Sequence, residues 1–185
     1  QAFSVPIEAC GMTVVRVELE YTEIQAHRGG MGLWPENTIM AMKNAIDLGV
    51  DMLELDLMIS KDSLVVVSHE EIMSSEYVTK PDGTRVTKAE EASLVLFGMP
   101  YDDIRRYDTG LAGDSRYPAR VRIAACKPLL SELLDATEAH IREKGGRNLR
   151  YNIEIKASKG KEQRCMAPDY KTFTDLCMAV ILEKG

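Results

Sequence analysis

Seven ionisable residues lie on or directly after short apolar stretches that would form strands, four of them (His27, Asp56, His69 and Glu154) at or near a strand's C-terminal end. The seven are His27, Arg28, Glu54, Asp56, His69, Glu154 and Lys156. Carboxylates are hard oxygen ligands that suit Mg²⁺ or Ca²⁺ better than zinc. Histidine acts as an acid or a base near neutral pH, and arginine and lysine bind phosphate. Together these residue types predict a site for metal-assisted phosphoryl transfer.

Each part of this set also has a simpler explanation. A single histidine at a strand end is more often structural, and alternating carboxylates such as Glu54 and Asp56 more often form a solvated strand face. Glu154 and Lys156 taken alone make an ion pair, and Glu36 favours a helix N-terminus. The functional interpretation therefore depends on the parts occurring together.

Hydrophobic periodicity predicts the elements that position these residues. Strands are predicted over residues 12–19, 23–27, 50–59, 64–68 and 151–155, and helices over 39–48, 101–107, 128–143 and about 169–183. Side chains two apart on a strand share a face, so Glu54 lies beside Asp56 and Glu154 beside Lys156. Strands that alternate with helices indicate a largely parallel sheet, and in parallel barrels the active site lies at the C-terminal ends of the strands.

The bulk composition fits one globular domain of 185 residues with a polar insertion at about 70–125. The net charge of −6 argues against nucleic-acid binding, and no apolar run approaches the roughly 18 residues of a membrane span. A start without methionine favours a processed protein, periplasmic or secreted, over a cytoplasmic one. The cysteines lack zinc spacing and are interpreted as free or buried thiols, with a Cys10 disulfide as the alternative.

Five short motifs, in this order and spacing, resemble the glycerophosphodiester phosphodiesterase family, in its exported bacterial form. They are His27-Arg28-Gly29, Pro35-Glu36-Asn37-Thr38, Glu54-Leu55-Asp56, Val67-Ser68-His69 and Asn152-Ile153-Glu154-Ile155-Lys156. The resemblance implies a (β/α)₈ TIM barrel. It also implies metal-dependent hydrolysis of small glycerophosphodiesters to an alcohol and glycerol 3-phosphate.

Carried over by position, the resemblance implies a role for each residue. The acid/base pair would be His27 and His69. The ligands of a divalent cation, Mg²⁺ or Ca²⁺, would be Glu54, Asp56 and Glu154. Phosphate contacts would come from Arg28 and Lys156, supported by Glu36, Asn37 and Glu70. The family usually has aspartate where this chain has Glu70, which keeps the charge but lengthens the arm.

Chain length limits the expected barrel. A (β/α)₈ barrel needs about 250 residues, so about its first half is expected here, either as a fragment or as a fold that a second copy completes. Two alternatives remain: a related phospholipase D-type barrel acting on sphingomyelin or lysophospholipid, and an inactive phosphate- or metal-binding module. The polar insertion favours the glycerophosphodiesterase.

Overall fold

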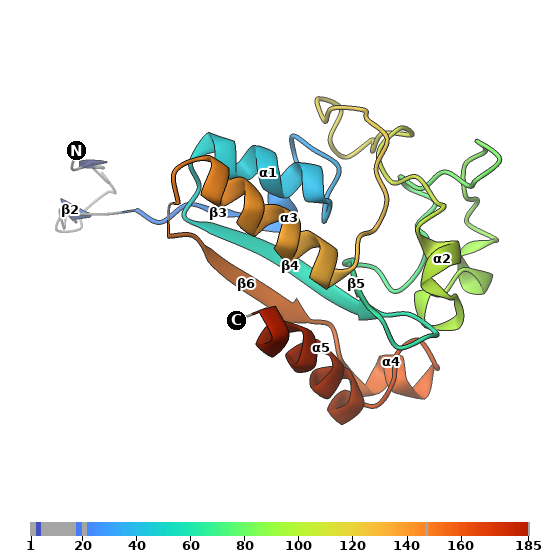
Figure 1. The fold of residues 1–185 in the computed structure, drawn as a ribbon. Helices are drawn as coiled ribbons and strands as arrows, with labels where there is room; N and C mark the ends of the chain where they lie inside the picture. The colour runs from blue at the N-terminus through green and yellow to red at the C-terminus, as the bar shows by residue number, and fades with distance from the viewer. Residues whose placement is uncertain (1–2, 5–17, 20–21, 147, 185) are drawn as a thin grey trace, which may run out of the picture.

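A small sheet with helices around it makes up the body of the protein (Figure 1). The structure is a computed structural model and describes residues 3–4, 18–19, 22–146 and 148–184. Its strands are β1 (Phe3–Ser4), β2 (Glu18–Leu19), β3 (Gln25–Ala26), β4 (Met52–Ile59), β5 (Val65–Val67) and β6 (Arg150–Ile155). Its helices are α1 (Ile39–Leu48), α2 (Tyr101–Ile104), α3 (Leu130–Glu143), α4 (Lys159–Gln163) and α5 (Tyr170–Lys184), and its 3₁₀ turns are η1 (His27–Gly29), η2 (Glu91–Ser93) and η3 (Leu96–Gly98).

Strand β4 is the central strand of the main sheet. It pairs in parallel with β3 and β6 and antiparallel with β5. Because β6 runs along one edge, β3 and β5 share the other, β3 beside the amino end of β4 and β5 beside its carboxyl end. Every residue of β4 after Met52 is buried, which is the burial expected of a strand covered on both faces.

Strand β5 departs from the parallel pairing expected for most of the sheet. It follows β4 directly and returns beside it as a hairpin, with Leu57 opposite Val67 and Ile59 opposite Val65. The intervening residues 60–64 are too few for the crossover that a parallel connection requires. Among the residues that the structure describes, the expected parallel pairing is therefore confined to β3, β4 and β6; β1 and β2 form a separate antiparallel pair.

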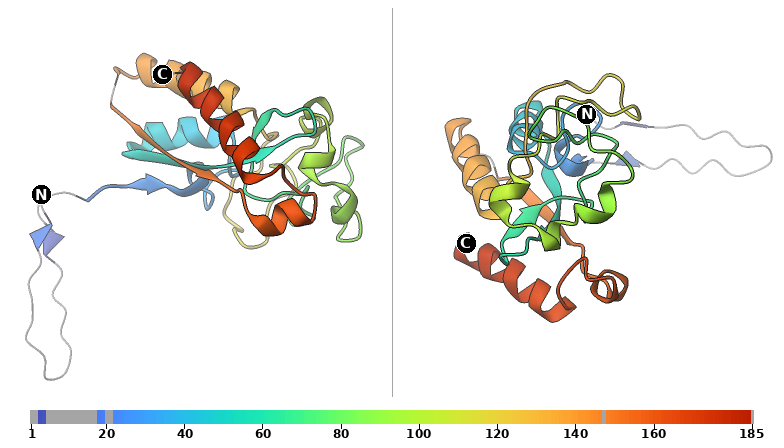
Figure 2. Two further views of the ribbon diagram at one scale, coloured as in Figure 1. Left: turned by 90° about the horizontal axis from the view of Figure 1, so that it is seen from below. Right: turned by 90° about the vertical axis from the view of Figure 1, so that its right-hand side faces the viewer.

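The longer helices lie around the outside of the sheet, α1 against α3 and α3 against α5 (Figure 2). Helix α1 begins after Thr38, whose hydroxyl accepts a hydrogen bond from the Ala41 N–H at 3.2 Å. It ends at Gly49, which takes the left-handed conformation with φ 84°. Both boundaries confirm the sequence prediction. Side chains with no exposed surface fill the space between the layers, among them Met42, Leu53, Leu55, Leu57, Leu133 and Phe173.

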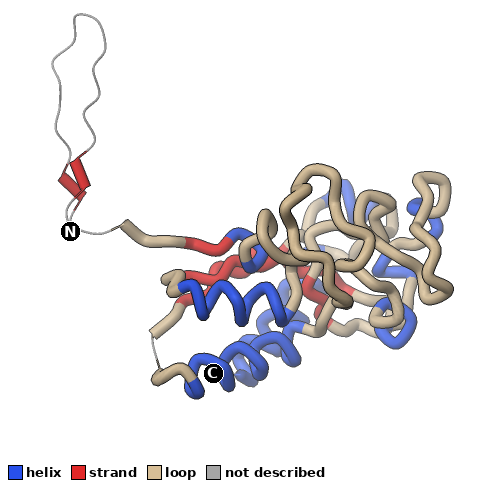
Figure 3. Tube along the Cα trace, turned by 90° about the horizontal axis from the view of Figure 1, so that it is seen from above, coloured by secondary structure: helices blue, strands red, loops and turns tan. Residues whose placement is uncertain are grey.

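A long loop-rich segment, residues 68–129, joins β5 to α3 (Figure 3) and lies beyond the end of the sheet to which the arrow of β4 points (Figure 1). It contains α2, η2 and η3. Its end returns to β5, because Val66 bridges Leu129 and the Val67 N–H donates to the Pro128 carbonyl at 2.9 Å. The segment therefore leaves the sheet and rejoins it at the same strand, next to the expected site.

Several predicted elements are shorter in the structure. The strand expected over 23–27 is only Gln25–Ala26, since η1 begins at His27, and the helix expected over 101–107 ends at Ile104. Of the strand expected over 12–19, residues 12–17 lie outside the described residues, as does Cys10. The other three cysteines are free thiols, as expected. Within the part of the chain that the structure describes, no helix has the length and apolar character needed to cross a membrane.

Candidate active site

The pairing of β4 with β6 brings the three expected metal ligands together. Asp56 and Glu154 are register partners on these adjacent parallel strands, and Glu54 precedes Asp56 by two residues on the same face. One oxygen from each carboxylate lies within 4.8 Å of the others. Glu54 and Asp56 are 5% and 1% exposed, so the solvated-face explanation of these two residues is wrong. Glu154 remains exposed.

Glu54 connects β4 to the turn after β3. Its Oε2 accepts a hydrogen bond from the Arg28 N–H at 2.7 Å and lies 3.9 Å from Nε2 of His27. Burial raises the pKa of Glu54, although the Arg28 N–H and the nearby His27 oppose the rise. The imidazole of His27 is 58% exposed, so it stands at the open side of the carboxylate group.

Asp56 is held from both directions by Asn37. The Asn37 amide donates to Asp56 Oδ2 at 2.9 Å, and its carbonyl oxygen accepts from the Asp56 N–H at 3.3 Å. Within the described residues no hydrogen bond reaches the second oxygen, Oδ1, which is buried. A buried carboxylate oxygen without a hydrogen bond is costly unless a positive charge faces it.

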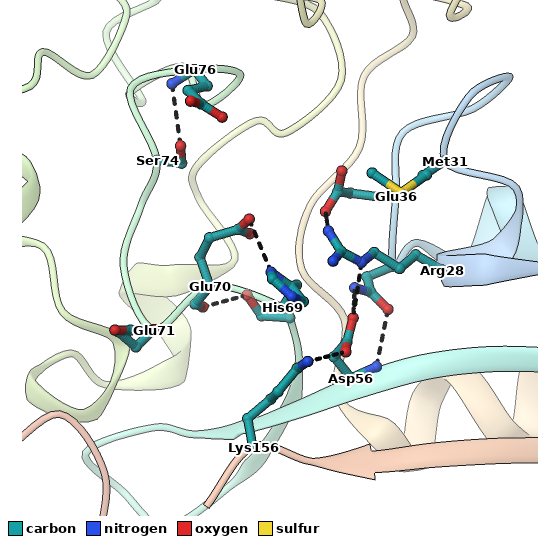
Figure 4. A network of polar contacts seen from close by, with 12 residues as sticks. Arg28, Met31, Glu36, Asp56, His69, Glu70, Glu71, Ser74, Glu76 and Lys156 are labelled. Atoms are coloured by element: carbon teal, nitrogen blue, oxygen red, sulfur yellow. Dashed lines mark hydrogen bonds and ion pairs between the residues drawn. The ribbon is translucent and has the colours of Figure 1, made fainter. Parts of the chain in front are cut away.

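Lys156 supplies that positive charge. Its Nζ lies 3.0 Å from Asp56 Oδ1 and 2.7 Å from Glu154 Oε2, and Figure 4 shows it reaching Asp56 from beside β6. Burial opposes the charge on Lys156, but contacts with the two carboxylates outweigh burial, so the pKa of Lys156 is raised. The ammonium group thus occupies the position between two carboxylates that a cation would take.

A turn with positive φ angles places the Arg28 side chain beside the carboxylates of the site. Arg28 has φ 52° and is followed by Gly29 with φ 78°. A Cβ added to Gly29 would lie 2.9 Å from Cβ of Ala41, so this close approach to α1 requires glycine. The turn directs the guanidinium toward Asp56, with Nε 3.3 Å from Oδ2, and toward Glu36, with Nη1 2.9 Å from Oε1.

Glu36 is buried between two arginines, Arg28 and Arg120. Its Oε2 lies 3.2 Å from Nη2 of Arg120, which belongs to the loop-rich segment and has a side chain only 2% exposed. Burial opposes the charge on Arg28, yet the contacts with Glu36 and then Asp56 raise its pKa. The expected supporting role of Glu36 therefore has a geometric basis, and Arg120 is a partner that the sequence did not indicate.

His69 follows β5 and is held by the residue next to it. Its Nδ1 lies 3.2 Å from Glu70 Oε1, and the Ser68 N–H donates to the Asp56 carbonyl at 2.9 Å. In Figure 4, His69 lies between Glu70 and the group formed by Arg28, Asp56 and Lys156. Its side chain is 34% exposed, so it remains accessible.

Comparison with known proteins decides the family. Residues 27–176 match the model of the glycerophosphoryl diester phosphodiesterase family. This protein belongs to that family. A glycerophosphodiester phosphodiesterase of Caldanaerobacter subterraneus is 32% identical over 136 residues, which cover 74% of this chain and 46% of the relative. Lysophospholipase D GDPD1 of Homo sapiens is 56% identical over 46 residues, covering 25% of this chain and 15% of the relative.

Solved structures support the fold of this phosphodiesterase family member. A structure from Silicibacter pomeroyi, assigned to the glycerophosphoryl diester phosphodiesterases, is 25% identical with a TM-score of 0.75 and covers 88% of this chain and 54% of its own. An Oleispira antarctica phosphodiesterase bound to its product sn-glycerol-3-phosphate is 21% identical with a TM-score of 0.60, over 88% and 53% of the two chains. The chain thus has about the first half of the TIM-barrel fold, and it spans about half the length, or less, of the relatives that it matches.

The ten site residues expected from the sequence fall into two connected groups in this family member. One contains His27, Arg28, Glu36, Asn37, Glu54, Asp56, Glu154 and Lys156; the other contains His69 and Glu70. The Ser68 N–H joins the second group to the Asp56 carbonyl. The sequence assigned no site role to Arg120, Tyr77 or Lys127, which contact Glu36, Glu70 and Ser68 and lie in or beside the insertion, where no periodic pattern assigned positions to side chains.

Proposed function

We propose that this protein is a divalent-cation-dependent phosphodiesterase that hydrolyses glycerophosphodiesters to an alcohol and glycerol 3-phosphate. The observation that carries the proposal is the convergence of Glu54, Asp56 and Glu154 beside two histidines and two basic side chains. The relatives named glycerophosphodiester phosphodiesterase, and the product complex of the Oleispira antarctica enzyme, support this substrate class.

The three carboxylates fit a cation such as Mg²⁺ or Ca²⁺. All donors are oxygens, two of the three carboxylates are buried, and Asp56 Oδ1 faces a positive charge without accepting a hydrogen bond. When bound there, such an ion would supply positive charge to the phosphoryl oxygens. In the structure, the positive charge between Asp56 and Glu154 is the ammonium of Lys156.

The protein's own residues would carry the proton transfers and hold the phosphate. The guanidinium of Arg28 and the ammonium of Lys156 place positive charge beside the carboxylates, where a substrate phosphate would come to lie. One of the accessible histidines, His27 or His69, would take a proton from the attacking water or the neighbouring glycerol hydroxyl. The other would donate a proton to the alcohol oxygen as its bond to phosphorus breaks. Attack by the hydroxyl would give a cyclic phosphate, which water would then open to yield glycerol 3-phosphate.

The direct test is release of glycerol 3-phosphate from glycerophosphoethanolamine with Mg²⁺, Ca²⁺ or a chelator. The variants are His27→Ala and His69→Ala. The matched control is His140→Ala, because His140 is the third histidine of the chain and pairs with Asp47 on the outer helices. We expect chelator-sensitive release, lowered at least about 100-fold in the two site variants and unchanged in the control. Loss of turnover in His140→Ala alone, or turnover indifferent to chelator, would contradict the proposal.

A second candidate is lysophospholipase D activity. It is favoured by the 56% identity over 46 residues to the human lysophospholipase D, which exceeds the identity to the longer bacterial matches. Release of choline from lysophosphatidylcholine, compared with turnover of glycerophosphocholine, separates the two candidates. Binding of Mg²⁺ or Ca²⁺ without turnover of either substrate would instead support a binding module.

Export and self-association stay predictions. Location in the periplasm or outside the cell, and completion of the barrel by a second copy of the chain, follow from the sequence interpretation. Fractionation of the native host checks the first, and the mass of the purified protein by light scattering checks the second.

A further inference from the structure

A buried lysine to which the sequence assigned no site role contacts Ser68, the residue that precedes His69. Lys127 stands just before α3 and is 4% exposed. Its Nζ donates to the Ser68 hydroxyl at 2.8 Å and to the Tyr77 hydroxyl at 3.4 Å. Ser68 and Tyr77 are themselves buried, at 0% and 2% exposed. A buried ammonium with two hydroxyl partners is costly to desolvate unless it also faces a negative charge.

That negative charge is Glu70, and both hydroxyls lead to it. The Tyr77 hydroxyl donates to Glu70 Oε2 at 2.5 Å, and the Ser68 hydroxyl donates to the Glu70 carbonyl at 2.7 Å. Lys127 thereby fixes Glu70 at its side chain and at its backbone. Burial alone would raise the pKa of Glu70, but the contact with His69 and the charge of Lys127 outweigh burial and lower it well below its usual range.

The direction of these hydrogen bonds is set by what each group can do. Protonated lysine has donors and no acceptor, so the two hydroxyls accept from Lys127. The Tyr77 hydroxyl then donates to the Glu70 carboxylate and the Ser68 hydroxyl to the Glu70 backbone carbonyl. An ionised carboxylate can only accept, and the second carboxylate oxygen, Oε1, lies 3.2 Å from Nδ1 of His69. Nδ1 must therefore carry the proton, and the other ring nitrogen, Nε2, is left as the acceptor.

We propose that Lys127 and Tyr77 are positioning residues, which hold Glu70 so that neutral His69 carries its proton on Nδ1 and turns Nε2 toward the substrate. This inference rests on the proposed function, in which His69 transfers a proton at that face. It also accounts for glutamate at position 70: its longer arm spans from the His69 ring to the Tyr77 hydroxyl.

The tautomer of His69 can be measured without turnover. The chain has three histidines, so long-range ¹H–¹⁵N spectra of the ¹⁵N-histidine-labelled 185-residue chain resolve them, with His27→Gln and His140→Gln as assignment variants. We expect the Nδ1–H form of neutral His69 in the unmodified protein. In Tyr77→Phe and Lys127→Met, the ratio of the two tautomers should move about fivefold toward Nε2–H, the change that one neutral hydrogen bond supports.

Matched controls remove the same groups elsewhere. Tyr151→Phe deletes a hydroxyl that contacts Thr137 and Glu138, and Lys80→Met deletes an ammonium that pairs with Glu90. Neither control should move the His69 tautomer. An unchanged ratio in Tyr77→Phe, the variant that keeps the ring and the fold, overturns the inference whatever Lys127→Met does.

Turnover, where present, gives the second readout. With glycerophosphoethanolamine as substrate, Tyr77→Phe should lower kcat about tenfold with little change in KM, because orientation of a proton donor or acceptor affects the chemical step. A tautomer shift in a chain that hydrolyses no diester supports the role of Lys127 and Tyr77 while the phosphodiesterase proposal fails. A kcat that falls without a tautomer shift overturns the positioning role.

Discussion

Asn37 and Asp56 hold each other by two hydrogen bonds that run in opposite directions. The Asn37 amide group donates to the carboxylate and accepts from the backbone N–H of the same residue. Asn37 can do so because it adopts φ 55°, a left-handed conformation in which asparagine is enriched. One side chain therefore fixes both the position and the orientation of a proposed metal ligand.

Removal of the Asn37 side chain should loosen Asp56. We expect Asn37→Ala to lower the free energy of unfolding by about 2 kcal/mol, since two buried hydrogen bonds are lost and alanine is strained at this φ. Asn37→Gly should cost less because glycine accepts this backbone conformation. Urea unfolding measures both variants, with Asn44→Ala as the control because its amide makes one bond to the Met40 carbonyl within α1. Equal stability of the alanine and glycine variants would contradict the role of φ.

Lys156 should weaken the binding of a divalent cation at the site and strengthen the binding of a phosphate. Its ammonium lies between Asp56 and Glu154, so it competes with a cation and attracts a phosphate. We expect Lys156→Met to tighten Mg²⁺ or Ca²⁺ binding about tenfold and to weaken glycerol 3-phosphate binding by a similar factor. These factors correspond to loss of an electrostatic interaction of about 1.4 kcal/mol between Lys156 and each ligand. Titration calorimetry with the metal alone, and then with the phosphate, measures both.

The control for this charge is a lysine of equal burial. Lys161 is 14% exposed against 15% for Lys156, and it pairs with Glu71. Lys161→Met should leave both affinities unchanged. If both ligands bound more weakly to Lys156→Met, the competition between Lys156 and the cation would be refuted.

The sequence predicted those parts of the site that follow from strand geometry. Glu54 and Asp56 share a face because they are two residues apart, and Glu154 meets them because the carboxyl ends of neighbouring parallel strands lie together. These relations hold for any side chain at these positions. Burial of Glu54 and Asp56 was not predictable from alternation, because an alternating strand fits one solvated face as well as two covered faces.

Other relations depend on loops, which carry no periodic signal. Arg120 and Tyr77 lie in the loop-rich segment and Lys127 near its end. Arg120 and Lys127 contact Glu36 and Ser68, which are more than 50 residues away in sequence, and Tyr77 reaches Glu70 across an irregular stretch of seven residues. The antiparallel pairing of β5 with β4 could have been predicted from the sequence, since the connection of residues 60–64 is too short for a parallel crossover. The signal for Lys127 is a lysine directly before an apolar helix start, which alone indicates nothing about burial.

The pH dependence of stability should show the contribution of Glu91. Its carboxylate accepts from the Ser75 N–H at 2.8 Å and hydroxyl at 2.6 Å and lies 2.7 Å from Lys88 Nζ. Burial opposes the charge on Glu91, but the contacts from Lys88 and Ser75 outweigh burial and lower its pKa to about 2. An unfolded glutamate has a pKa of about 4.3, so its contribution to stability is complete above that pH and is lost as the pH falls toward about 2.

We therefore expect Glu91→Gln to be less stable than the unmodified protein at pH 7, with the difference shrinking as the pH falls from about 4.3 to about 2. Thermal unfolding across this range measures the difference. Glu183→Gln, at an exposed position of α5, serves as the control and should show no such trend. A difference between Glu91→Gln and the unmodified protein that grows on acidification would contradict the assignment.

Arg120 should stabilise the protein more than Arg116, although both pair with Asp114. Arg120 lies 3.5 Å and Arg116 2.7 Å from Asp114 Oδ2, but their side chains are 2% and 43% exposed. Arg120 also donates to the Met31 carbonyl at 2.7 Å and pairs with Glu36, so it joins the loop-rich segment to the turn that carries Arg28.

We expect Arg120→Met to cost about 3 kcal/mol of unfolding free energy, because it leaves buried carboxylates with fewer partners, and Arg116→Met to cost about 1 kcal/mol or less. Hydrogen exchange of residues 110–123 should quicken in Arg120→Met alone, since local opening follows the loss of that anchor. If the distance to Asp114 decided the loss of stability, Arg116→Met would lose more, because Arg116 is closer to Asp114 than Arg120 is. A larger loss of unfolding free energy in Arg116→Met than in Arg120→Met would therefore contradict the role of burial.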